Sequence, residues 1–325
     1  MFKHFFTVLL FLCVSSWSFE KSKVEKETGL LDLKSEPSYS AEVISYFACY
    51  SLDFADSIKH FFGYVQADSF RIATHVFLTP ENSRTVLMTH GYLDHVGILK
   101  NVIKECLNAG YSVVAFDLPG HGLSSGDPAS IGSFTEYARV YDSVRKSVSP
   151  VTTAPLTLVA HSTGCAAALE YLAEKGGIDI KEIILLAPLI KTAYFGFLKA
   201  GQAIISPFTK RTVRLYRNQS SDKEFLNFLR NDTLRIESCP LRWASAYFSW
   251  FDKTQSLQPR STPPVTVIQG SRDDVVDWRY NVPFLKEKFT DIKVYMIKGA
   301  KHQLMNEAGN YKTEFEKTIR DCLYK

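Results

Sequence analysis

Short apolar runs alternate with longer stretches of helical periodicity along most of the chain. The apolar runs lack the regular alternation of a half-exposed sheet, which is typical of strands buried on both faces of a parallel sheet. The predicted strands cover residues 70–78, 84–89, 111–116, 156–160, 182–186, 265–269 and 293–297. The predicted helices cover residues 41–59, 96–109, 133–147, 163–175, 279–289 and the stretch from about residue 306. This order predicts the α/β fold class, with a mostly parallel sheet flanked by helices.

Residues 190–257 interrupt the alternation. They contain helical stretches at 221–230 and 241–251 but no strong strand signal. Because the strand-and-helix alternation resumes afterwards, the interruption is predicted to be a helical cap inserted into the sheet domain. The two parts of the α/β core are then residues 41–189 and 258–325.

The N-terminal end differs from the rest of the chain. Residues 1–18 have a basic start, an apolar run at 5–14 and small residues at Ser16 and Ser18, which is the form of a signal peptide. The apolar run is shorter than the roughly 20 residues that span a bilayer. We therefore predict export, periplasmic or secreted, with a membrane anchor as the alternative. Residues 19–40 are charged and polar, and they are predicted to be an exposed lead-in with little fold of its own.

Composition narrows the function classes. The chain of 325 residues is 46% hydrophobic and 22% charged, as in globular proteins, and its formal net charge of +4 does not suggest a nucleic-acid partner. Five of its six cysteines would remain after removal of the leader, and their wide spacing favours neither a disulfide framework nor a zinc site. One bridge, for instance from Cys239, stays open. The sequence predicts no metal and no cofactor.

A serine stands where a predicted strand turns directly into a predicted helix, at residues 159–164 (VAHSTG). A nucleophile elbow needs this context and small residues two positions to either side. Gly164 supplies one of them, and Ala160 replaces the glycine that is more usual at the other. Ser162 is therefore the predicted nucleophile. The alternative is an ordinary helix N-cap, where serine is favoured anyway.

Four further motifs follow at predicted strand ends. They are residues 90–95 (HGYLDH), 116–124 (FDLPGHGLS), 270–277 (GSRDDVVD) and 299–302 (GAKH). With the elbow, the chain resembles α/β-hydrolases of the lysophospholipase and monoacylglycerol lipase type, which are also grouped with serine aminopeptidases. The resemblance covers about residues 70–323. It implies an α/β-hydrolase fold, with the helical cap inserted after the sixth strand.

Two more side chains complete the expected chemistry. A serine hydroxyl needs a base to remove its proton, and a neutral imidazole suits that role at neutral pH. His302 follows the last predicted strand and is the candidate base. A carboxylate must then hold the imidazole, and three aspartates compete for this position. The resemblance favours Asp273, with Asp274 in reserve and Asp277 as a helix N-cap. The order Ser162, Asp273, His302 is that of α/β-hydrolases.

Negative charge that develops on the substrate oxygen needs hydrogen-bond donors. The backbone N–H of Thr163 follows the nucleophile at a helix start, and that of Tyr92 follows His90 and Gly91. These two N–H groups are predicted to form the oxyanion hole. Because the backbone serves here, the side chains of Tyr92 and Thr163 are not expected to be essential.

The remaining histidines of these motifs are interpreted as structural. His95 and His121 are predicted to brace their loops by hydrogen bonds, and His161 to support the elbow beside the nucleophile. Asp117 is predicted to cap backbone N–H groups in the tight turn that follows it.

The cap, residues 190–257, is basic and aromatic. It holds eleven Lys or Arg against five Asp or Glu, a net charge of +6, and twelve aromatic residues. One interpretation is a lid whose inner face takes an acyl chain and whose basic outer face meets anionic lipid. The other is that the aromatic side chains form the cap's own core and the charges its solvated side. The sequence leaves both open.

These observations predict a serine hydrolase that cleaves carboxylic esters of lipids, such as a lysophospholipid or a monoacylglycerol, through an acyl-enzyme. The expected partners are a small lipid or ester and, through the basic aromatic cap, a membrane surface. The first alternative is aminopeptidase-type amide hydrolysis on the same triad. It needs an acidic cap residue such as Glu224, Asp232 or Glu237 to hold the substrate amine. The second is a non-catalytic protein that binds lipid or membrane.

Overall fold

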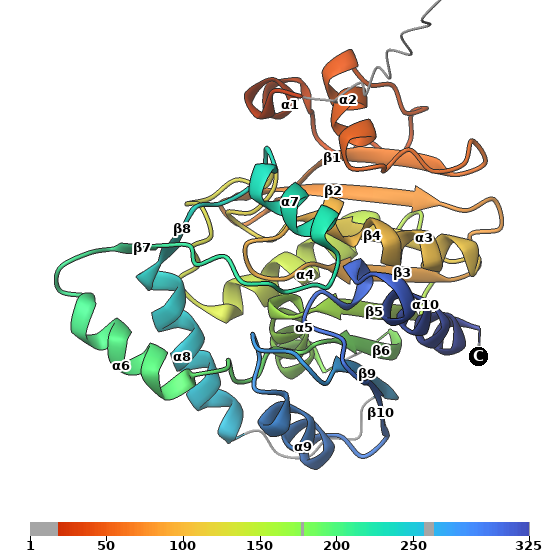
Figure 1. Ribbon diagram of the computed structural model, residues 1–325. Coiled ribbons are helices and arrows are strands. Elements are labelled where there is room, and N and C mark those ends of the chain that lie inside the picture. The colour runs from red at the N-terminus through yellow and green to blue at the C-terminus, as the bar shows by residue number, and fades with distance from the viewer. Residues whose placement is uncertain (1–18, 177–178, 257–262, 325) are drawn as a thin grey trace, which may run out of the picture.

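The computed structural model describes residues 19–176, 179–256 and 263–324, and its centre is one large sheet (Figure 1). The strands of this sheet are β1 (Lys59–Ala67), β2 (Phe70–Leu78), β3 (Thr85–Thr89), β4 (Ser112–Phe116), β5 (Leu156–His161), β6 (Ile180–Leu186), β9 (Val265–Gly270) and β10 (Ile292–Ile297). The predicted leader, residues 1–18, and the predicted boundary at 257–258 lie outside the described residues.

The sheet is mostly parallel, as predicted. Its strand order is β1-β2-β4-β3-β5-β6-β9-β10. Only the pairings of β1 with β2 and of β2 with β4 are antiparallel among the described strands of this sheet. All other neighbours run parallel, so the carboxyl ends of β3, β5, β9 and β10 lie on the same edge. Loops that leave this edge can therefore meet at one site.

Helices cover both faces of the sheet. α4 (Phe134–Val148) and α5 (Thr163–Lys175) pack together on one face, whereas α3 (Lys100–Asn108) and α10 (Gly309–Leu323) pack together on the other. α9 (Trp278–Lys288) flanks the edge strand β10.

Successive side chains of the strands enter two separate cores. Leu158 and Ala160 of β5 join the core beneath α4 and α5, whereas Val159 between them joins the core beneath α3 and α10. Burial on both faces is the reason why the apolar runs in the sequence do not alternate.

The cap contains three helices, α6 (Phe195–Ile205), α7 (Lys223–Asn231) and α8 (Leu241–Gln255). Two strands of three residues each, β7 (Arg211–Val213) and β8 (Ser238–Pro240), pair antiparallel within it. The sequence analysis missed these strands because three residues are too few to show a strand periodicity. α6 packs on α8, and α8 contacts α4; Figure 1 shows both cap helices at the left of the molecule.

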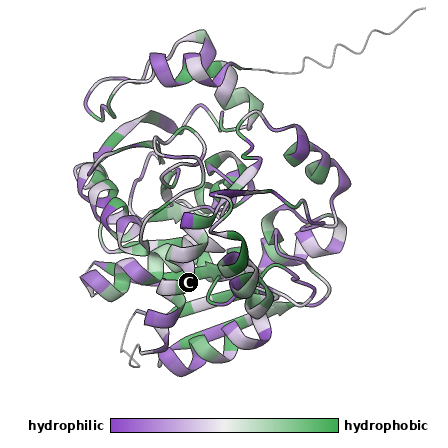
Figure 2. Ribbon diagram, turned by 90° about the vertical axis from the view of Figure 1, so that its left-hand side faces the viewer, coloured by the Kyte–Doolittle hydropathy of each residue, from purple (hydrophilic) through white to green (hydrophobic). Residues whose placement is uncertain are grey.

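The aromatic side chains of the cap divide between the two interpretations. Those on α8 join the core beneath α4 and are buried, namely Trp243, Tyr247, Phe248 and Trp250. α6 contains no buried residue, and Phe197 on it is 78% exposed. Figure 2, in which this side of the molecule faces the viewer, shows hydrophobic and hydrophilic residues interspersed on it. Most aromatic residues of α8 are therefore core, Phe195 of α6 packs against them, and Phe197 and Phe208 are exposed.

The predicted helix at residues 41–59 is wrong beyond Cys49. α2 (Ala41–Cys49) ends there, and the chain then forms β1, which was not predicted. Gly63 obscures the strand character of this run, because a glycine weakens a strand unless another backbone approaches closely. The structure contains such an approach, since a Cβ placed on Gly63 would lie 2.6 Å from the Cα of Leu31.

The prediction that residues 19–40 have little fold is also wrong. They contain α1 (Lys21–Glu27), in which Val24 is fully buried. Phe19 is buried as well, and its ring packs edge-on against Tyr46 of α2 at 5.3 Å between centroids. These two apolar anchors hold a segment whose many charges suggested an exposed chain.

The chain after α1 runs along the outer edge of β1. The N–H of Tyr64 donates to the carbonyl oxygen of Gly29 at 2.9 Å, and the N–H of Leu31 donates to the carbonyl oxygen of Tyr64 at 3.0 Å. The lead-in thus makes strand-like contacts with the edge of the sheet.

Two further observations concern membrane-spanning helices and cysteines in the described residues. Within the described ranges, no helix is both long enough and apolar enough to cross a membrane. Among the cysteines in those ranges, Cys49, Cys106, Cys165 and Cys239 are free thiols.

Candidate active site

Ser162 occupies the turn between β5 and α5 in a strained backbone conformation. Its φ of 51° and ψ of −114° lie in a region that residues other than glycine rarely adopt. Its side chain makes no capping hydrogen bond to α5, so it does not serve as an ordinary N-cap. The turn instead presents the hydroxyl group at the edge of the sheet, as in a nucleophile elbow.

The small residues beside Ser162 allow this turn to pack. A Cβ placed on Gly164 would lie 2.6 Å from the carbonyl oxygen of His90 at the end of β3. Ala160, two positions before the serine, is buried in the core beneath α4 and α5. A glycine is thus required on the helix side, whereas the strand side accepts one methyl group.

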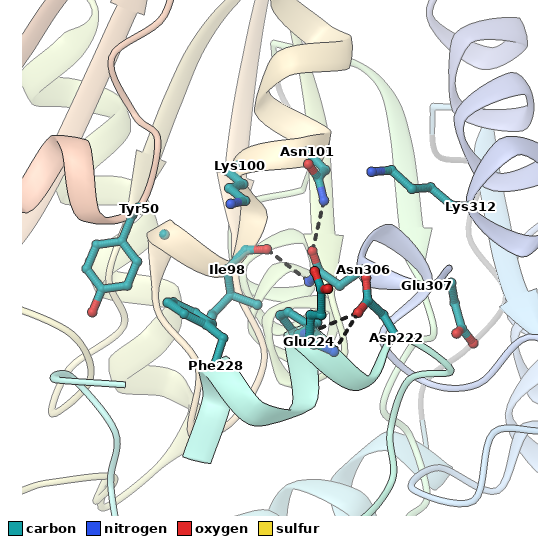
Figure 3. A pocket seen from close by; sticks show the side chains of 12 residues that line it. Tyr50, Ile98, Lys100, Asn101, Asp222, Glu224, Phe228, Asn306, Glu307 and Lys312 are labelled. Carbon is teal, nitrogen blue, oxygen red and sulfur yellow. Dashed lines mark hydrogen bonds between the residues drawn. The ribbon is translucent and has the colours of Figure 1, made fainter. Parts of the chain in front are cut away.

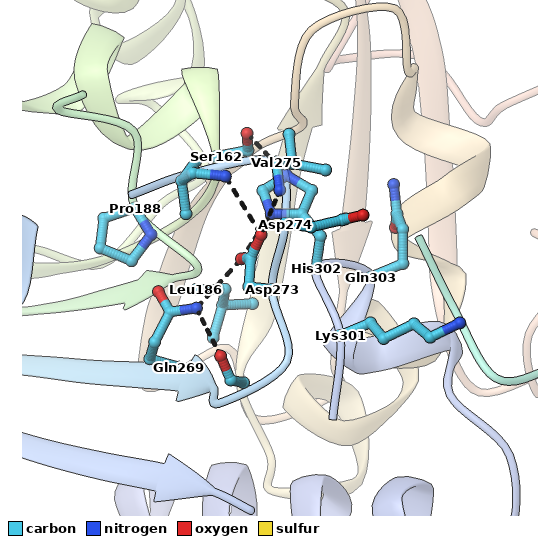
Figure 4. Close-up of polar contacts among 12 residues, drawn as sticks. Ser162, Leu186, Pro188, Gln269, Asp273, Asp274, Val275, Lys301, His302 and Gln303 are labelled. Atoms are coloured by element: carbon cyan, nitrogen blue, oxygen red, sulfur yellow. Dashed lines mark hydrogen bonds and ion pairs between the residues drawn. The ribbon is translucent and has the colours of Figure 1, made fainter. Parts of the chain in front are cut away.

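His302 and Asp273 form a chain of hydrogen bonds with Ser162 (Figure 4). Nε2 of His302 lies 2.9 Å from the Ser162 hydroxyl oxygen, and Nδ1 lies 2.8 Å from Oδ2 of Asp273. Because an ionised carboxylate only accepts, Nδ1 carries a proton and donates it to Asp273. Nε2 is then free to accept the proton of the serine hydroxyl. All three side chains are buried.

The two candidate acids lie in different environments. Oδ1 of Asp273 accepts the N–H groups of Val275 and Val276 at 2.9 and 3.1 Å, which fixes the carboxylate toward His302. Asp274 is exposed and makes no hydrogen bond to the imidazole. Asp277 caps α9 by accepting the N–H of Tyr280, as predicted. The geometry therefore favours Asp273 over Asp274.

Charge coupling shifts the pKa values of Asp273 and His302 in opposite directions. Burial raises the pKa of Asp273, but the neighbouring His302 and the hydrogen bonds to the carboxylate outweigh burial, so the pKa lies below its usual 3.8. Burial lowers the pKa of His302, but the charge of Asp273 and its hydrogen bond outweigh this effect. The pKa of His302 is therefore raised above its usual 6.5.

Of the two predicted oxyanion donors, Thr163 adjoins the serine, and Tyr92 directly follows Gly91, which lies close to it. Thr163 is the first residue of α5, where backbone N–H groups have no acceptor within the helix. Gly91 approaches the elbow closely, since a Cβ on it would lie 3.1 Å from the Cβ of Ser162. The side chain of Tyr92 is engaged elsewhere, with its ring stacked on Trp243 at 3.8 Å between centroids. The side chain of Tyr92 therefore contacts the cap, and its backbone N–H stays a predicted donor.

With this geometry established, comparisons with known proteins assign the family. The serine aminopeptidase S33 profile matches residues 80–309, which include the elbow and the other motif loops. The chain belongs to this family. It is an α/β-hydrolase of the lysophospholipase and monoacylglycerol lipase type, and thus an enzyme of the serine hydrolase class.

Individual relatives of this S33 chain are distant. It is 23% identical to the monoglyceride lipase homolog of Monkeypox virus, over 74% of this chain and 88% of the relative. It is 24% identical to the phospholipase YtpA of Bacillus subtilis, over 68% of this chain and 88% of the relative.

Two solved structures share the fold of the S33 chain. The Paleococcus ferrophilus monoacylglycerol lipase has 22% identity and a TM-score of 0.67, over 78% of this chain and 98% of that one. A soluble variant of the Saccharomyces cerevisiae monoglyceride lipase has 19% identity and a TM-score of 0.68, over 80% of this chain and 93% of that one.

In this S33 enzyme the motif histidines connect loops around the site. Nε2 of His90 accepts the N–H of Leu118 at 2.9 Å, which ties the loop after β3 to the loop after β4. Nδ1 of His121 lies 2.9 Å from the carbonyl oxygen of Pro119 within the latter loop. Nε2 of His161 lies 3.2 Å from the carbonyl oxygen of His302. Burial lowers the pKa of His161 to about 3, so it stays neutral beside the triad.

Asp117 begins the turn that His90 and His121 brace. Its carboxylate accepts the N–H of Val96 at 2.8 Å and the N–H of Leu123 at 2.9 Å. A Cβ on Gly122 would lie 2.1 Å from this carboxylate, so the turn requires glycine there.

His95 makes a connection that the sequence analysis missed. Besides accepting the N–H of Gly97 in its own loop, it lies 2.8 Å from Oδ2 of Asp232 in the cap. The other oxygen of Asp232 accepts the Tyr50 hydroxyl at 2.5 Å. The cap, the loop after β3 and the residue after α2 are thus joined at one buried carboxylate. The sequence did not indicate this contact, because Tyr50, His95 and Asp232 are far apart along the chain.

Two glutamines near the triad were also missed. Nε2 of Gln269, in β9, donates to Oδ2 of Asp273 at 3.0 Å. Nε2 of Gln303 donates to the buried carboxylate of Asp94 at 2.9 Å. Each lies within four residues of a predicted site residue, which is the only signal that the sequence offered.

A separate pocket lies on the α7 side of the cap (Figure 3). It has a volume of about 350 Å³ and lies between α7, the start of α3 and the segment before α10. Glu224 lines it together with Lys100 and Lys312, whereas no triad residue does. No group of three His, Cys, Asp or Glu side chains suited to a metal ion is present in the described part of the chain.

Proposed function

We propose that the protein is a serine esterase that cleaves carboxylic esters of lipids, such as a lysophospholipid or a monoacylglycerol. The observation that carries this proposal is the hydrogen-bonded chain from Ser162 through His302 to Asp273 at the edge of the sheet. The proposed substrate class is supported by relatives named as a monoglyceride lipase homolog and a phospholipase.

In the proposed reaction, Ser162 attacks the ester carbonyl carbon while Nε2 of His302 takes the hydroxyl proton. The N–H groups of Tyr92 and Thr163 donate to the oxygen that becomes negative. The ester C–O bond then breaks, and the alcohol leaves with the proton held by His302. Water attacks the acyl-enzyme in the same way and releases the fatty acid.

We also propose that the exposed surface around α6 contacts membranes. Phe197, Phe208, Val213 and Leu215 are each at least 78% exposed. The same surface carries the exposed Lys210, which favours anionic lipid head groups. Ser substitutions at Phe197 and Phe208 are expected to lower sedimentation with anionic vesicles, and unchanged sedimentation would count against the contact.

We propose, finally, that residues 1–18 direct export. Ser16 and Ser18 suit cleavage before Phe19. N-terminal sequencing of protein from the exported fraction should begin at Phe19. Recovery in the fraction that is not exported, with Met1 still present, would contradict the proposal.

The aminopeptidase alternative finds less support. Of the three acidic residues considered for binding a substrate amine, Asp232 is engaged by His95 and Tyr50, and Glu237 is paired with Arg235. Glu224 lines the separate pocket on the α7 side.

The proposal is tested by labelling the purified protein with a fluorophosphonate probe and by assaying a substrate panel. The panel contains lysolipids, monoacylglycerols, short-chain esters and aminoacyl amides. Ser162→Ala should lose the label and the esterase activity, whereas the exposed Ser249→Ala should keep both. Labelling that persists in Ser162→Ala, or turnover of amides alone, would overturn the proposal.

A further inference from the structure

Residues 214–220, here called the strap, connect β7 to the turn before α7. The strap contacts three loops that leave the carboxyl edge of the sheet. The contacts are Nη1 of Arg214 with the carbonyl oxygen of Leu93 at 3.5 Å, Nη1 of Arg217 with the carbonyl oxygen of Asp274 at 2.6 Å, and the carbonyl oxygen of Gln219 with the N–H of Gln303 at 2.9 Å.

The position of these contacts places the strap around the nucleophile. Each contacted residue directly follows a site residue in the sequence: the proposed oxyanion donor Tyr92, the acid Asp273 and the base His302. A second contact reinforces the third loop, since Nζ of Lys301 donates to the carbonyl oxygen of Ser220 at 3.1 Å. The strap therefore borders the three loops that carry the site residues.

The strap brings two guanidinium groups to this position, and neither of them forms an ion pair. Within the described residues, neither Arg214 nor Arg217 has a carboxylate at ion-pair distance. Several other basic residues of the cap do form ion pairs, namely Lys191 with Asp277, Lys199 with Asp252, Arg211 with Asp127, Arg235 with Glu237 and Lys253 with Glu170. No ion pair therefore neutralises Arg214 or Arg217 directly, although Asp94 interacts with Arg214 from beyond ion-pair distance.

Arg214 is the more unusual of the two because it is only 9% exposed. Its guanidinium group meets the carbonyl oxygens of Leu93 and Ile236, at 3.5 and 3.3 Å, and lies over the ring of Tyr216. Burial of a guanidinium group without a carboxylate is costly unless an anion compensates it. Arginine donates in a fork that matches the oxygens of a phosphate.

We infer that Arg214 and Arg217 bind the phosphate of a lysophospholipid head group while Ser162 attacks its acyl ester. This inference rests on the proposed esterase function and names its substrate class. A monoacylglycerol with the same acyl chain presents the same ester but no phosphate. The strap therefore selects lysophospholipids over neutral glycerides.

A purely structural role for Arg214 makes a different prediction. Burial raises the pKa of the nearby Asp94 carboxyl group, and Arg214 partly offsets this effect. If offsetting Asp94 were the whole role, loss of Arg214 would disturb the site equally for every ester. The two accounts are therefore separated by the ratio of two substrates, not by the activity on one.

The experiment compares kcat/KM for a lysophosphatidate and a monoacylglycerol that share one short acyl chain. Both are kept below the concentration at which they aggregate, so that no lipid surface attracts the basic cap. The variants are Arg214→Gln and the more exposed Arg217→Gln. Arg230→Gln is the matched control, because it removes the same charge from an exposed position of the same cap.

Each strap variant should lower kcat/KM for the lysophosphatidate about tenfold more than for the glyceride, as expected for one lost charge-assisted hydrogen bond. Arg230→Gln should leave the ratio unchanged. Glycerol 3-phosphate should inhibit the wild-type enzyme competitively, and the strap variants more weakly.

Equal losses on both substrates in Arg217→Gln and Arg214→Gln would overturn the head-group assignment while leaving the esterase function intact. A ratio that also falls in Arg230→Gln would overturn it in favour of general attraction to the cap. Absence of turnover of either lipid by the wild type, with Ser162 unlabelled, would instead be a failure of the esterase proposal.

Discussion

In the proposed mechanism, Ser162 and its partners are prepared for chemistry by the residues around them. The strained φ of 51° at Ser162 is tolerated because β5 and α5 fix both sides of the turn. His302 receives its orientation from Asp273, whose second oxygen is held by backbone N–H groups. The chemistry thus depends on neighbours that do not themselves react.

The identity of the triad acid gives a test at the residue scale. Asp273→Asn keeps the shape of the side chain but lets it present an N–H to His302, which favours the wrong tautomer. We expect kcat to fall roughly 1,000-fold to 10,000-fold. Asp274→Asn should change kcat by less than about threefold, because this side chain is exposed and makes no hydrogen bond to the imidazole. A larger loss in Asp274→Asn than in Asp273→Asn would reverse the assignment.

The pH dependence of hydrolysis is a second test at this scale. His302 must be neutral to accept the serine proton, and its pKa is raised above 6.5. Activity should therefore rise with pH along an acid limb whose midpoint in kcat/KM lies above 6.5. Since Asp273 is what raises this pKa, the residual activity of Asp273→Asn should show a limb at lower pH. An acid limb that does not move in the variant would contradict the coupling.

At the scale of elements, the cap is attached to the core through Asp232. Burial raises the pKa of this carboxyl group, but His95 and the hydrogen bonds from Tyr50 and Leu234 outweigh it, so the pKa lies below 3.8. The carboxylate is therefore ionised at neutral pH, with donors on both of its oxygens.

Removal of that carboxylate should loosen the cap. Asp232→Ala leaves buried donors of His95 and Tyr50 without an acceptor, which is expected to cost about 3 kcal/mol of unfolding free energy. Glu237→Gln, which breaks an exposed ion pair with Arg235, should cost less than about 1 kcal/mol. Denaturant unfolding gives both values, and hydrogen exchange should show faster opening of α7 in Asp232→Ala. Equal stability of the two variants would refute the role of Asp232.

Elements with a long, uninterrupted pattern were predicted from the sequence, and elements defined by tertiary contacts were not. The run at 156–161 and the helix after it carry their own periodicity, so β5 and α5 were found to within a residue or two. β1 was missed because a glycine inside a strand is unfavourable unless another backbone lies close to it. Leu31 lies that close to Gly63, but only the folded structure shows this. The same holds for the site, where motifs indicated Ser162 and His302 but no local signal indicated Asp232.

At the scale of the whole molecule, the N-terminal segment belongs to the folded body. Phe19 and Val24 insert into the core shared with α2, far in sequence from the residues that react. Phe19→Ala should therefore cost about 3 kcal/mol of unfolding free energy. Leu30→Ala should cost less than about 0.5 kcal/mol, because Leu30 is 73% exposed. Thermal or denaturant unfolding of the two variants measures the difference, and equal stabilities would show that the segment does not contribute.

The backbone contacts of Gly29 and Leu31 with Tyr64 have a consequence beyond stability. A strand at the margin of a sheet offers unsatisfied N–H and C=O groups to any other extended chain, and proteins commonly cover such margins. Here the segment after α1 occupies part of that position on β1. A chain shortened past Leu31 would expose the N–H and C=O groups of Tyr64 at this margin and would be prone to self-association through added strands.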